Sequence, residues 1–551
     1  MDNQILHLLK QTAQYFSDHQ RQAYLVGGSI RNLLLGEPCI DWDIVTGADA
    51  PRLARGLADK LGGHYAHLHD KASRVVIKEE QEITIDISPL MGATIEDDLR
   101  KRDFTLNAIA APLDAVVSHF EFGLSGLKVT GNVGATLAAA RSAARFDASF
   151  QNILIDPLHG AADLAAHRLK AADSEVFRHD PLRMLRAVRL MMRYQLNMDT
   201  WTEGLIIRDA ALLPLVAAER IHDELYAILD PDAATERLRF LDAHGLFTVL
   251  IPEFIPARGM RQPSPHYWDV LEHSLESVGA LERLAEALQE GTGENPLSFR
   301  MNRRGRFIVP TADLSARSPQ SPARMETLEM LPPSEDLAEI GTLLQEAEQQ
   351  GIFQFASLTS PRMKMAALLH DIGKPVTYSI DGAGAIHFYN HPQAGVPLAQ
   401  QIMTRLSAST QDRRLVQQVT AHHMRPGQLG QNSPITPRAI RRYFVDLGPT
   451  GIYTALISLA DHLATLGPQP LSSSWTQHLA TVRLLLTRYI RERESILPPR
   501  LLSPEELMRR LSLEPGPLVG QLLESIAEAQ AEGRIHSKEE ALWLAEEQLQ
   551  G

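Results

Sequence analysis

The segment that most constrains the fold lies near the start of the chain, where a glycine pair separates an apolar run from a helical pattern. Residues 24–26 are typical of a short strand, Gly27-Gly28 of a tight turn, and 29–35 of the first turns of a helix. Backbone amides at a helix N-terminus form a cradle for phosphate groups, and Arg31 adds a fixed positive charge. The segment therefore predicts a phosphate-binding turn between a strand and a helix.

Two carboxylates follow this turn. Asp41 and Asp43 alternate with Trp42 and Ile44, a period of two that predicts a strand with both carboxylates on one face. Two neighbouring carboxylates repel each other unless a divalent cation lies between them, and magnesium prefers such oxygen ligands. Alone, a glycine pair is usually a turn and an Asp-x-Asp a solvated strand edge. Phosphates beside a magnesium pair, however, indicate phosphoryl-transfer chemistry.

In this order the two elements resemble the signature of the class II tRNA nucleotidyltransferase and bacterial poly(A) polymerase family, a branch of the polymerase-β-like transferases. The resemblance implies an α/β head in which Asp41 and Asp43 are catalytic and hold two Mg²⁺ ions. It also implies that Gly27, Gly28, Ser29 and Arg31 contact the nucleotide.

The stretch 96–110 carries a second match. From the residues alone, its charged half predicts a solvated turn and helix start, and its second half the body of a helix. Residues 101–108, K-R-D-F-T-L-N-A, are close to the family's R-R-D-F-T-x-N-A motif. By that resemblance Arg102 pairs with phosphate, Asp103 accepts a ribose hydroxyl, and Asn107 belongs to the nucleotide site.

A third match begins at Asp180-Pro181, where aspartate suits a helix N-cap and proline the first helical position. Arg183 and Arg186 lie on one face of the expected helix, and apolar residues lie on the other. The family's D-P-x-R-x-x-R element is complete here. It implies that Asp180, Arg183 and Arg186 lie beside the incoming nucleotide.

The family's base-reading element, E-D-x-x-R in many CCA-adding members, corresponds to Glu219-Arg220 and the residues after them. An E-R-x-x-x-E form occurs among both CCA-adding and poly(A)-type enzymes. Glu219 and Arg220 are thus expected to contact the nucleotide, and the choice of base stays open.

Histidines and aspartates recur on successive apolar segments in the second half of the chain. A single buried His-Asp pair is usually structural, but imidazole and carboxylate ligands from several helices can build a transition-metal site. The order resembles the HD phosphohydrolase superfamily, which implies His273, His370, Asp371 and Asp461 as ligands. A second metal ion would be held by His391 with His422 or His423, and Lys374 would steady a phosphate.

The composition is that of an ordinary globular protein, and a net charge of −13 limits any RNA site to a local basic surface. No apolar run is long enough for a membrane span, no secretion signal is expected, and the single Cys39 fits a reducing cytoplasm. Beyond Ser503 the chain should be helical, with one surface helix over 524–547. The expected parts are a nucleotidyltransferase head at 1–134, a helical neck at 135–256, an HD domain at 257–470 with a flexible insertion at 290–336, and a helical tail at 471–551.

The expected fold is thus a polymerase-β-like α/β head followed by largely all-α domains, one of the HD type. The expected function is addition or repair of the 3′ CCA end of tRNA from CTP and ATP, with magnesium at the transferase site. The HD site would hold a transition metal or Mg²⁺ and hydrolyse phosphates on RNA ends. The alternatives are a poly(A) polymerase, an enzyme adding only A or only CC, or an HD phosphohydrolase with a vestigial head.

Overall fold

The computed structural model describes residues 3–125 apart from 38, 48, 70–71 and 79–81, together with 148–290, 335–431 and 434–550. It divides into two compact units, the first ending at Val216 and the second beginning at Ala217. This division falls inside the stretch 135–256 that we expected as one neck. The boundary expected at 134/135 and nearly all of the insertion expected at 290–336 lie outside the described residues.

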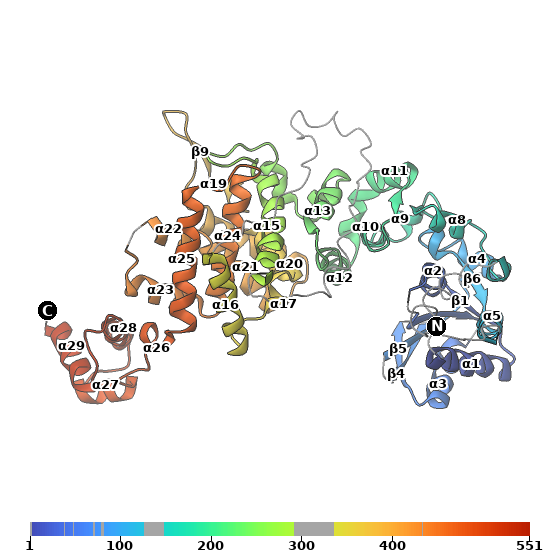
Figure 1. Ribbon diagram of the computed structural model, residues 1–551, viewed down its shortest axis with the longest axis horizontal. Helices are drawn as coiled ribbons and strands as arrows, with labels where there is room; N and C mark the ends of the chain where they lie inside the picture. The colour runs from blue at the N-terminus through green and yellow to red at the C-terminus, as the bar shows by residue number, and fades with distance from the viewer. Residues whose placement is uncertain are drawn as a thin grey trace. The chain divides into compact units, whose positions relative to one another are not determined.

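The first unit is built on one mixed six-stranded sheet in the order β3-β4-β5-β2-β1-β6 (Figure 1). β2 runs parallel to β5, whereas β1 pairs with β2 and β6 in antiparallel fashion. The polar–apolar alternation that begins at Asp41 formed a strand as expected. The strands are β1 (Ala23–Val26), β2 (Asp41–Thr46), β3 (His64–His69), β4 (Ala72–Lys78), β5 (Glu82–Pro89) and β6 (Ala110–Pro112).

Helices cover this sheet. α3 packs against β3, β4 and β5, α1 packs against α3 and α5, and α2 packs against β1 and β2. The helix predicted after the glycine turn is confirmed as α2. The helices are α1 (Asn3–Asp18), α2 (Gly28–Leu35), α3 (Ala50–Leu61) and α5 (Leu113–Ser125).

The expected helix body in the second half of 96–110 is wrong. The helix α4 (Ile95–Leu99) lies in the charged half, capped by Thr94, and the rest forms a turn, the 3₁₀ helix η1 (Thr105–Asn107) and β6. The apolar residues of the second half are buried because they complete the sheet and its core, not because they line a helix.

Short helices and a two-stranded parallel ladder complete the first unit. Its main helix, α10, buries one side and presents arginines on the other, as the spacing predicted. The remaining elements are α7 (Ala148–Gln151), α8 (Gly160–Ala165), β7 (Arg168–Leu169), α9 (Val176–His179), α10 (Arg183–Arg193), β8 (Asn197–Met198), α11 (Thr200–Asp209) and η3 (Ala210–Leu215).

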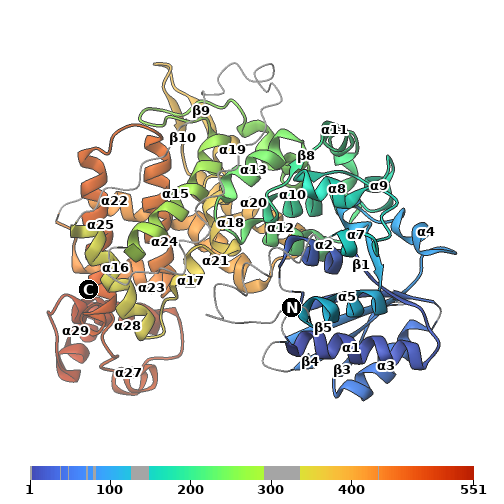
Figure 2. The same ribbon diagram turned by 45° about the vertical axis from the view of Figure 1, so that its right-hand side comes forward.

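In the part of the second unit that the structure describes, the chain is helical apart from one hairpin, β9 (Tyr378–Ile380) and β10 (Ile386–Phe388). Four of its helices pack in a closed series, α15 on α18, α18 on α21, α21 on α24 and α24 on α15, with α20 against α21 (Figure 2). These five are α15 (Val270–Glu290), α18 (Pro361–Leu369), α20 (His391–Arg405), α21 (Thr410–His422) and α24 (Thr450–Leu466). No helix within the described ranges is long and apolar enough to cross a membrane.

Further helices surround this bundle. α13 packs on α15, and α16 and α24 both pack on α25. The other helices before residue 500 are α12 (Ala218–Leu229), α13 (Ala234–Ala243), α14 (Leu246–Leu250), η4 (Pro252–Ala257), α16 (Glu335–Gln349), α17 (Phe355–Leu358), α19 (Lys374–Thr377), α22 (Arg425–Gln431), α23 (Pro437–Leu447), α25 (Ser473–Ile490) and α26 (Arg493–Ile496).

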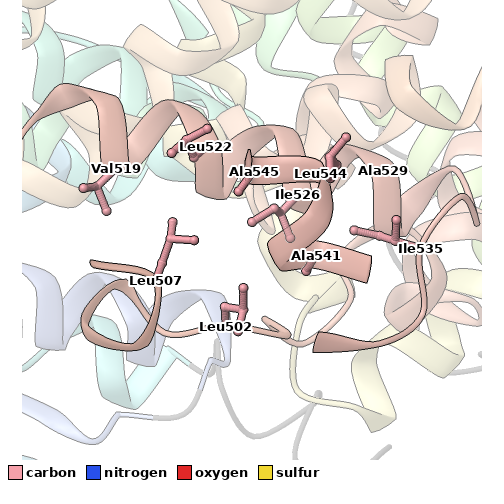
Figure 3. Close-up of a cluster of buried hydrophobic side chains, with 10 residues drawn as sticks. All are labelled: Leu502, Leu507, Val519, Leu522, Ile526, Ala529, Ile535, Ala541, Leu544 and Ala545. Carbon is pink, nitrogen blue, oxygen red and sulfur yellow. The ribbon is translucent and has the colours of Figure 1, made fainter. Parts of the chain in front are cut away.

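The end of the chain has a core of its own. The helices α27 (Pro504–Leu511), α28 (Pro517–Ala531) and α29 (Lys538–Gln550) bury a set of aliphatic side chains between them (Figure 3). The single surface helix expected over 524–547 is therefore wrong. Gly533, with a φ of 70°, lies in the turn between α28 and α29 and lets their apolar faces meet.

Candidate active site and metal centre

The glycine turn of the first unit lies directly against two functional side chains. Gly27 has a φ of 60°, and a β-carbon there would lie 2.7 Å from Nη1 of Arg102. A β-carbon on Gly28 would lie 3.3 Å from Oδ2 of Asp43. Two residues without side chains are therefore required, because an arginine and a carboxylate both approach the start of α2.

Asp41 and Asp43 lie at the beginning of β2, on the face opposite the buried Trp42. Ser29 connects α2 to this strand, since its hydroxyl accepts a hydrogen bond from the Asp43 amide at 2.7 Å and donates one to the Asp41 carbonyl at 3.1 Å. Burial raises the pKa of Asp43, although the positive charge of Arg102 opposes this. The structure thus places the Asp43 carboxylate against the glycine turn and Asp41 two residues before it on the same face of β2.

A third carboxylate, Asp86 on β5, was missed. It lies opposite Asp43 in the parallel ladder and opposite Arg74 in the antiparallel one, and Nε of Arg74 is 2.7 Å from Oδ1 of Asp86. Thr84, two residues earlier on the same face, donates a hydrogen bond to the Asp41 carboxylate. The alternation in residues 82–87 contained this information, because it puts Thr84 and Asp86 on one polar face.

Asp103 is a buried acceptor held by several donors. Its Oδ1 accepts hydrogen bonds from the Phe104 amide and the Asn107 side chain, each at 2.9 Å. Its Oδ2 lies 3.2 Å from Nε of Arg186. Burial alone would raise the pKa of Asp103, but Arg186 and Asn107 outweigh burial and hold it below its usual range. The carboxylate is therefore charged and fixed in place.

Arg31 is buried beneath the glycine turn. Its guanidinium donates to Oδ1 of Asn107 at 2.6 Å and to the hydroxyl of Tyr194 at 2.8 Å, and it also bonds Oδ1 of Asn32. Tyr194, which the sequence did not indicate, fixes this arginine by both its hydroxyl and its ring. Arg31 thus positions Asn107 and supplies positive charge from behind the turn.

Two further arginines expected at the nucleotide, Arg102 and Arg183, lie close to Asp103, one as its chain neighbour and the other by its charge. Arg102 pairs with Asp98 at 3.1 Å, and Arg183 donates long hydrogen bonds to the carbonyl of Lys101 at 3.4 Å and of Val176 at 3.5 Å. These weak bonds leave Arg183 available to a stronger acceptor such as phosphate.

The expected N-cap at Asp180 needs a correction. Helix α10 begins at Arg183 with Leu182 as its N-cap residue, and the Asp180 carboxylate accepts a hydrogen bond from the Leu182 amide at 3.2 Å. Asp180 therefore stabilises the turn that leads into the helix, because Pro181 and Leu182 form that turn and not its first helical residues.

Glu219 and Arg220 lie at the start of α12 in the second unit. Ser407, in the loop between α20 and α21, donates a hydrogen bond to the Glu219 carboxylate at 3.1 Å. The side chains expected around the nucleotide are thus divided between two units, and the role of Glu219 and Arg220 in choosing the base stays a prediction.

In the second unit, six side chains converge from different helices. Two groups of candidate ligand atoms share Asp371, and within each group all atoms lie within 4.8 Å of one another. The shared aspartate is typical of a centre for two metal ions. One group is His273, His370, Asp371 and Asp461, and the other is Asp371, His391 and His423.

Two of these buried atoms, Nε2 of His273 and Nε2 of His370, have no hydrogen-bond partner among the described residues. Yet Nε2 of His273 lies 3.0 Å from Oδ1 of Asp461, and Nε2 of His370 lies 3.2 Å from Oδ2 of Asp371. The atoms are close but poorly aligned for hydrogen bonds. Ligand atoms about 2.1 Å from one metal ion lie about 3.0–3.4 Å apart, so this donor set fits a cation.

The imidazoles are oriented by backbone carbonyls. Nδ1 of His370 lies 2.7 Å from the carbonyl oxygen of Ala367, and Nδ1 of His391 lies 2.9 Å from that of Phe388. His423 makes the same contact with Thr420 at 3.0 Å. A carbonyl only accepts, so each Nδ1 carries the proton and each Nε2 offers its lone pair to the centre.

The structure distinguishes the two neighbouring histidines between which the sequence left a choice. His423 is buried, and its Nε2 lies 3.4 Å from both Oδ1 of Asp371 and Nε2 of His391. His422 is only half-buried, and it is not part of either ligand group. His423 is therefore the candidate ligand, because the next residue on a helix points about 100° away.

Lys374 borders the centre on the side of Asp371. Its Nζ lies 2.5 Å from Oδ2 of Asp371, donates to Oε1 of Gln262 at 2.6 Å and lies 3.5 Å from Nε2 of His266. Gln262 and His266 were not foreseen. Burial lowers the pKa of His266 to about 4, and the charge of Lys374 adds to this effect, so His266 is neutral.

The comparisons with protein families match three parts of the chain. Residues 23–130 match the poly A polymerase head domain, and 195–258 match the "probable RNA and SrmB-binding site of polymerase A". Residues 335–466 match the HD domain. The first match contains both carboxylates of β2, and the last contains every candidate ligand of the metal centre except His273.

Two curated proteins are similar over nearly the whole chain. An A-adding tRNA nucleotidyltransferase of Deinococcus radiodurans is 29% identical over 94% of each chain. A CC-adding tRNA nucleotidyltransferase of Thermus thermophilus is 28% identical over 95% of this chain and 92% of its own.

Solved structures share the fold. A CCA-adding enzyme in complex with ATP matches all of this chain and 96% of its own, with a TM-score of 0.57 and 18% identity. The CCA-adding enzyme of Thermotoga maritima in complex with tRNA matches with a TM-score of 0.51, also at 18% identity, and covers 100% of this chain and 96% of that one.

Proposed function

We infer the function of this chain from the family to which it belongs, the tRNA nucleotidyltransferases and bacterial poly(A) polymerases with an HD domain. We propose that it adds or repairs the 3′-terminal CCA of tRNA from CTP and ATP. The observation that carries this proposal is the polar face of β2 and β5, where Asp41 and Asp43 lie beside the glycine turn and in register with Thr84 and Asp86.

Oxygen donors of this kind fit magnesium. Asp41 and Asp43 would hold two Mg²⁺ ions, which supply activation of the RNA 3′-hydroxyl and neutralisation of the triphosphate when bound. The amides of the glycine turn and Arg102 would orient the phosphates, and Asp103 would accept the ribose hydroxyl. Arg183 and Arg186 would offset the charge that develops on the leaving pyrophosphate.

A second candidate for the nucleotide specificity is the addition of only A or only CC. Relatives that match over nearly the whole chain include one named for adding A and others named for adding CC, so this chain could divide the work with another enzyme in the same way. Transcripts of tRNA lacking CCA, CA or A, incubated with CTP, ATP or both, distinguish these cases by product length. Completion from all three ends supports the CCA-adding proposal, and completion only from the end lacking A supports the A-adding one. Long A tails would indicate a poly(A) polymerase, and no extension would indicate a vestigial head.

For the second unit we propose a phosphohydrolase that acts on RNA 3′ ends. The imidazole-rich ligand set favours a transition metal over magnesium, and Lys374 would hold a phosphate oxygen. A 2′,3′-cyclic phosphate on a short RNA is the test substrate. Hydrolysis that depends on added Mn²⁺, Ni²⁺ or Zn²⁺ and is lost in His370→Ala supports the proposal, and hydrolysis unaffected by His370→Ala contradicts it.

A further inference from the structure

The hairpin β9–β10 joins two elements of the metal centre. It follows α19, which begins with Lys374, and it precedes His391, the first residue of α20. In Figure 1 the hairpin projects away from the helices of the second unit. Although it is short, it exposes large apolar side chains, with Tyr378 40% and Ile380 57% exposed.

Strand register sorts the hairpin side chains onto two faces. Phe388 lies opposite Tyr378 and Ile386 opposite Ile380, so these four share one face. His387 lies opposite Ser379 on the other face, where its ring stacks on Tyr389 at 4.8 Å. One face is thus apolar and aromatic, and the other is more polar.

The apolar face begins at the metal centre. The ring centroid of Phe388 lies 5.6 Å from Nζ of Lys374, which in turn lies 2.5 Å from Asp371. The ring of Tyr378, directly opposite Phe388 in the hairpin, lies 5.8 Å from the ring of Phe388, and Ile380 lies further along. The backbone carbonyl of Phe388 also orients His391. A cationic phosphate site and an exposed aromatic surface are therefore continuous.

We propose that Tyr378, Ile380 and Phe388 form a stacking platform for the terminal bases of a single-stranded RNA whose 3′ phosphate lies at Lys374 and the metal centre. Aromatic side chains beside a cationic site are how proteins bind unpaired nucleotides, since every base has an apolar face to stack. The platform extends from Phe388 outward to Ile380, which suits a strand better than an isolated phosphate. The proposal rests on the phosphohydrolase function proposed above.

The test uses the full-length protein and a short RNA that ends in 2-aminopurine with a 2′,3′-cyclic phosphate. We expect Tyr378→Ala to weaken binding of this RNA by about tenfold in metal-free protein, the size of effect that base stacking gives. With metal added, the variant should raise KM and leave kcat nearly unchanged. The matched control is Tyr389→Ala, which removes a tyrosine that is 70% exposed on the other face.

The outcomes separate this inference from the function on which it rests. Hydrolysis with equal RNA affinities for the wild type, Tyr378→Ala and Tyr389→Ala would overturn the platform and leave the phosphohydrolase intact. Platform-dependent binding without hydrolysis would support the platform and refute the phosphohydrolase. An RNA whose terminal residue is abasic should bind the wild type about as weakly as the intact RNA binds Tyr378→Ala, and equal binding of both RNAs to the wild type would overturn the platform.

Discussion

At the scale of single residues, both sites depend on close approaches that leave no room for substitution. Arg102 and Asp43 approach the backbone of the glycine turn, and Gly373 allows α20 to approach the His-Asp pair, since a β-carbon there would lie 2.1 Å from the His391 carbonyl. Glycine is required at these positions because a β-carbon would collide with the neighbouring atoms. Substitutions at these glycines should therefore weaken ligand binding although they change no charge.

Gly27→Ala should raise the KM for CTP and ATP at least tenfold, because its β-carbon would displace Arg102 from the phosphate cradle. The positive φ should also lower stability by about 1–3 kcal/mol. Steady-state kinetics of nucleotide addition and a thermal melt measure the two effects. Gly47→Ala is the matched control, since a β-carbon there meets nothing within 4 Å. Equal KM values in the two variants would contradict the proposed cradle.

His423→Ala should reduce the metal content of the purified protein, because it removes a ligand atom 3.4 Å from the shared Asp371. His422→Ala removes the same side chain one residue earlier and should leave the metal content unchanged. Elemental analysis after gel filtration measures both. Loss of metal in His422→Ala but not in His423→Ala would show that the ligand assignment is wrong.

At the scale of elements, a buried cation holds α12 in place within the second unit. Nζ of the completely buried Lys364 donates to the carbonyls of Leu229, Asp230 and Pro231 at the end of α12, and it pairs with Glu282 of α15 at 2.8 Å. It binds the end of the helix, where unpaired carbonyls favour a positive charge. This anchor joins α12 to α15 and α18, which belong to the same unit.

Lys364→Met should lower the free energy of unfolding of the second unit by about 3–5 kcal/mol, because it leaves three carbonyls without their donor and Glu282 without its cation. Chemical denaturation followed by circular dichroism measures the loss. Lys60→Met provides the control, since its pair with Asp18 is exposed and should contribute at most about 1 kcal/mol. Similar losses in both variants would refute the anchoring role.

The sequence predicted the elements in which short periodicity and burial agree. The carboxylate strand, the glycine turn and the arginine face of α10 follow from local patterns, whereas the candidate metal ligands were assigned from the resemblance to the HD superfamily. Contacts between distant segments were not accessible in this way. Nothing near Tyr194 shows that it binds Arg31, and only the packing of α21 distinguishes His423 from His422. The break at Gly533 was missed because polar residues on both sides continue a helical pattern.

At the scale of the whole molecule, the candidate catalytic carboxylates and the candidate metal centre belong to different compact units. The carboxylates of β2 and the arginines of α10 belong to the first unit, and every candidate ligand of the metal centre belongs to the second. No ligand is shared between these two sets. The two chemistries should therefore be separable by substitution.

His370→Ala should remove metal from the second unit and abolish hydrolysis of a cyclic phosphate, while nucleotide addition stays within about twofold of the wild type. Parallel assays of the same preparation, together with its metal content, test this separation. A matching loss of nucleotide addition in a variant that remains folded would show that the two sites depend on each other.

The most direct test of the central claim is nucleotide addition by Asp43→Asn. This variant keeps the shape of the side chain and removes one charge of the carboxylate pair. Because burial raises the pKa of Asp43, its charged form is disfavoured in the metal-free fold, so the variant should melt no lower than the wild type in EDTA. Labelled CTP and ATP incorporation into tRNA lacking CCA should fall by about 10³-fold or more. A folded Asp43→Asn that keeps a tenth of the wild-type rate would contradict the account.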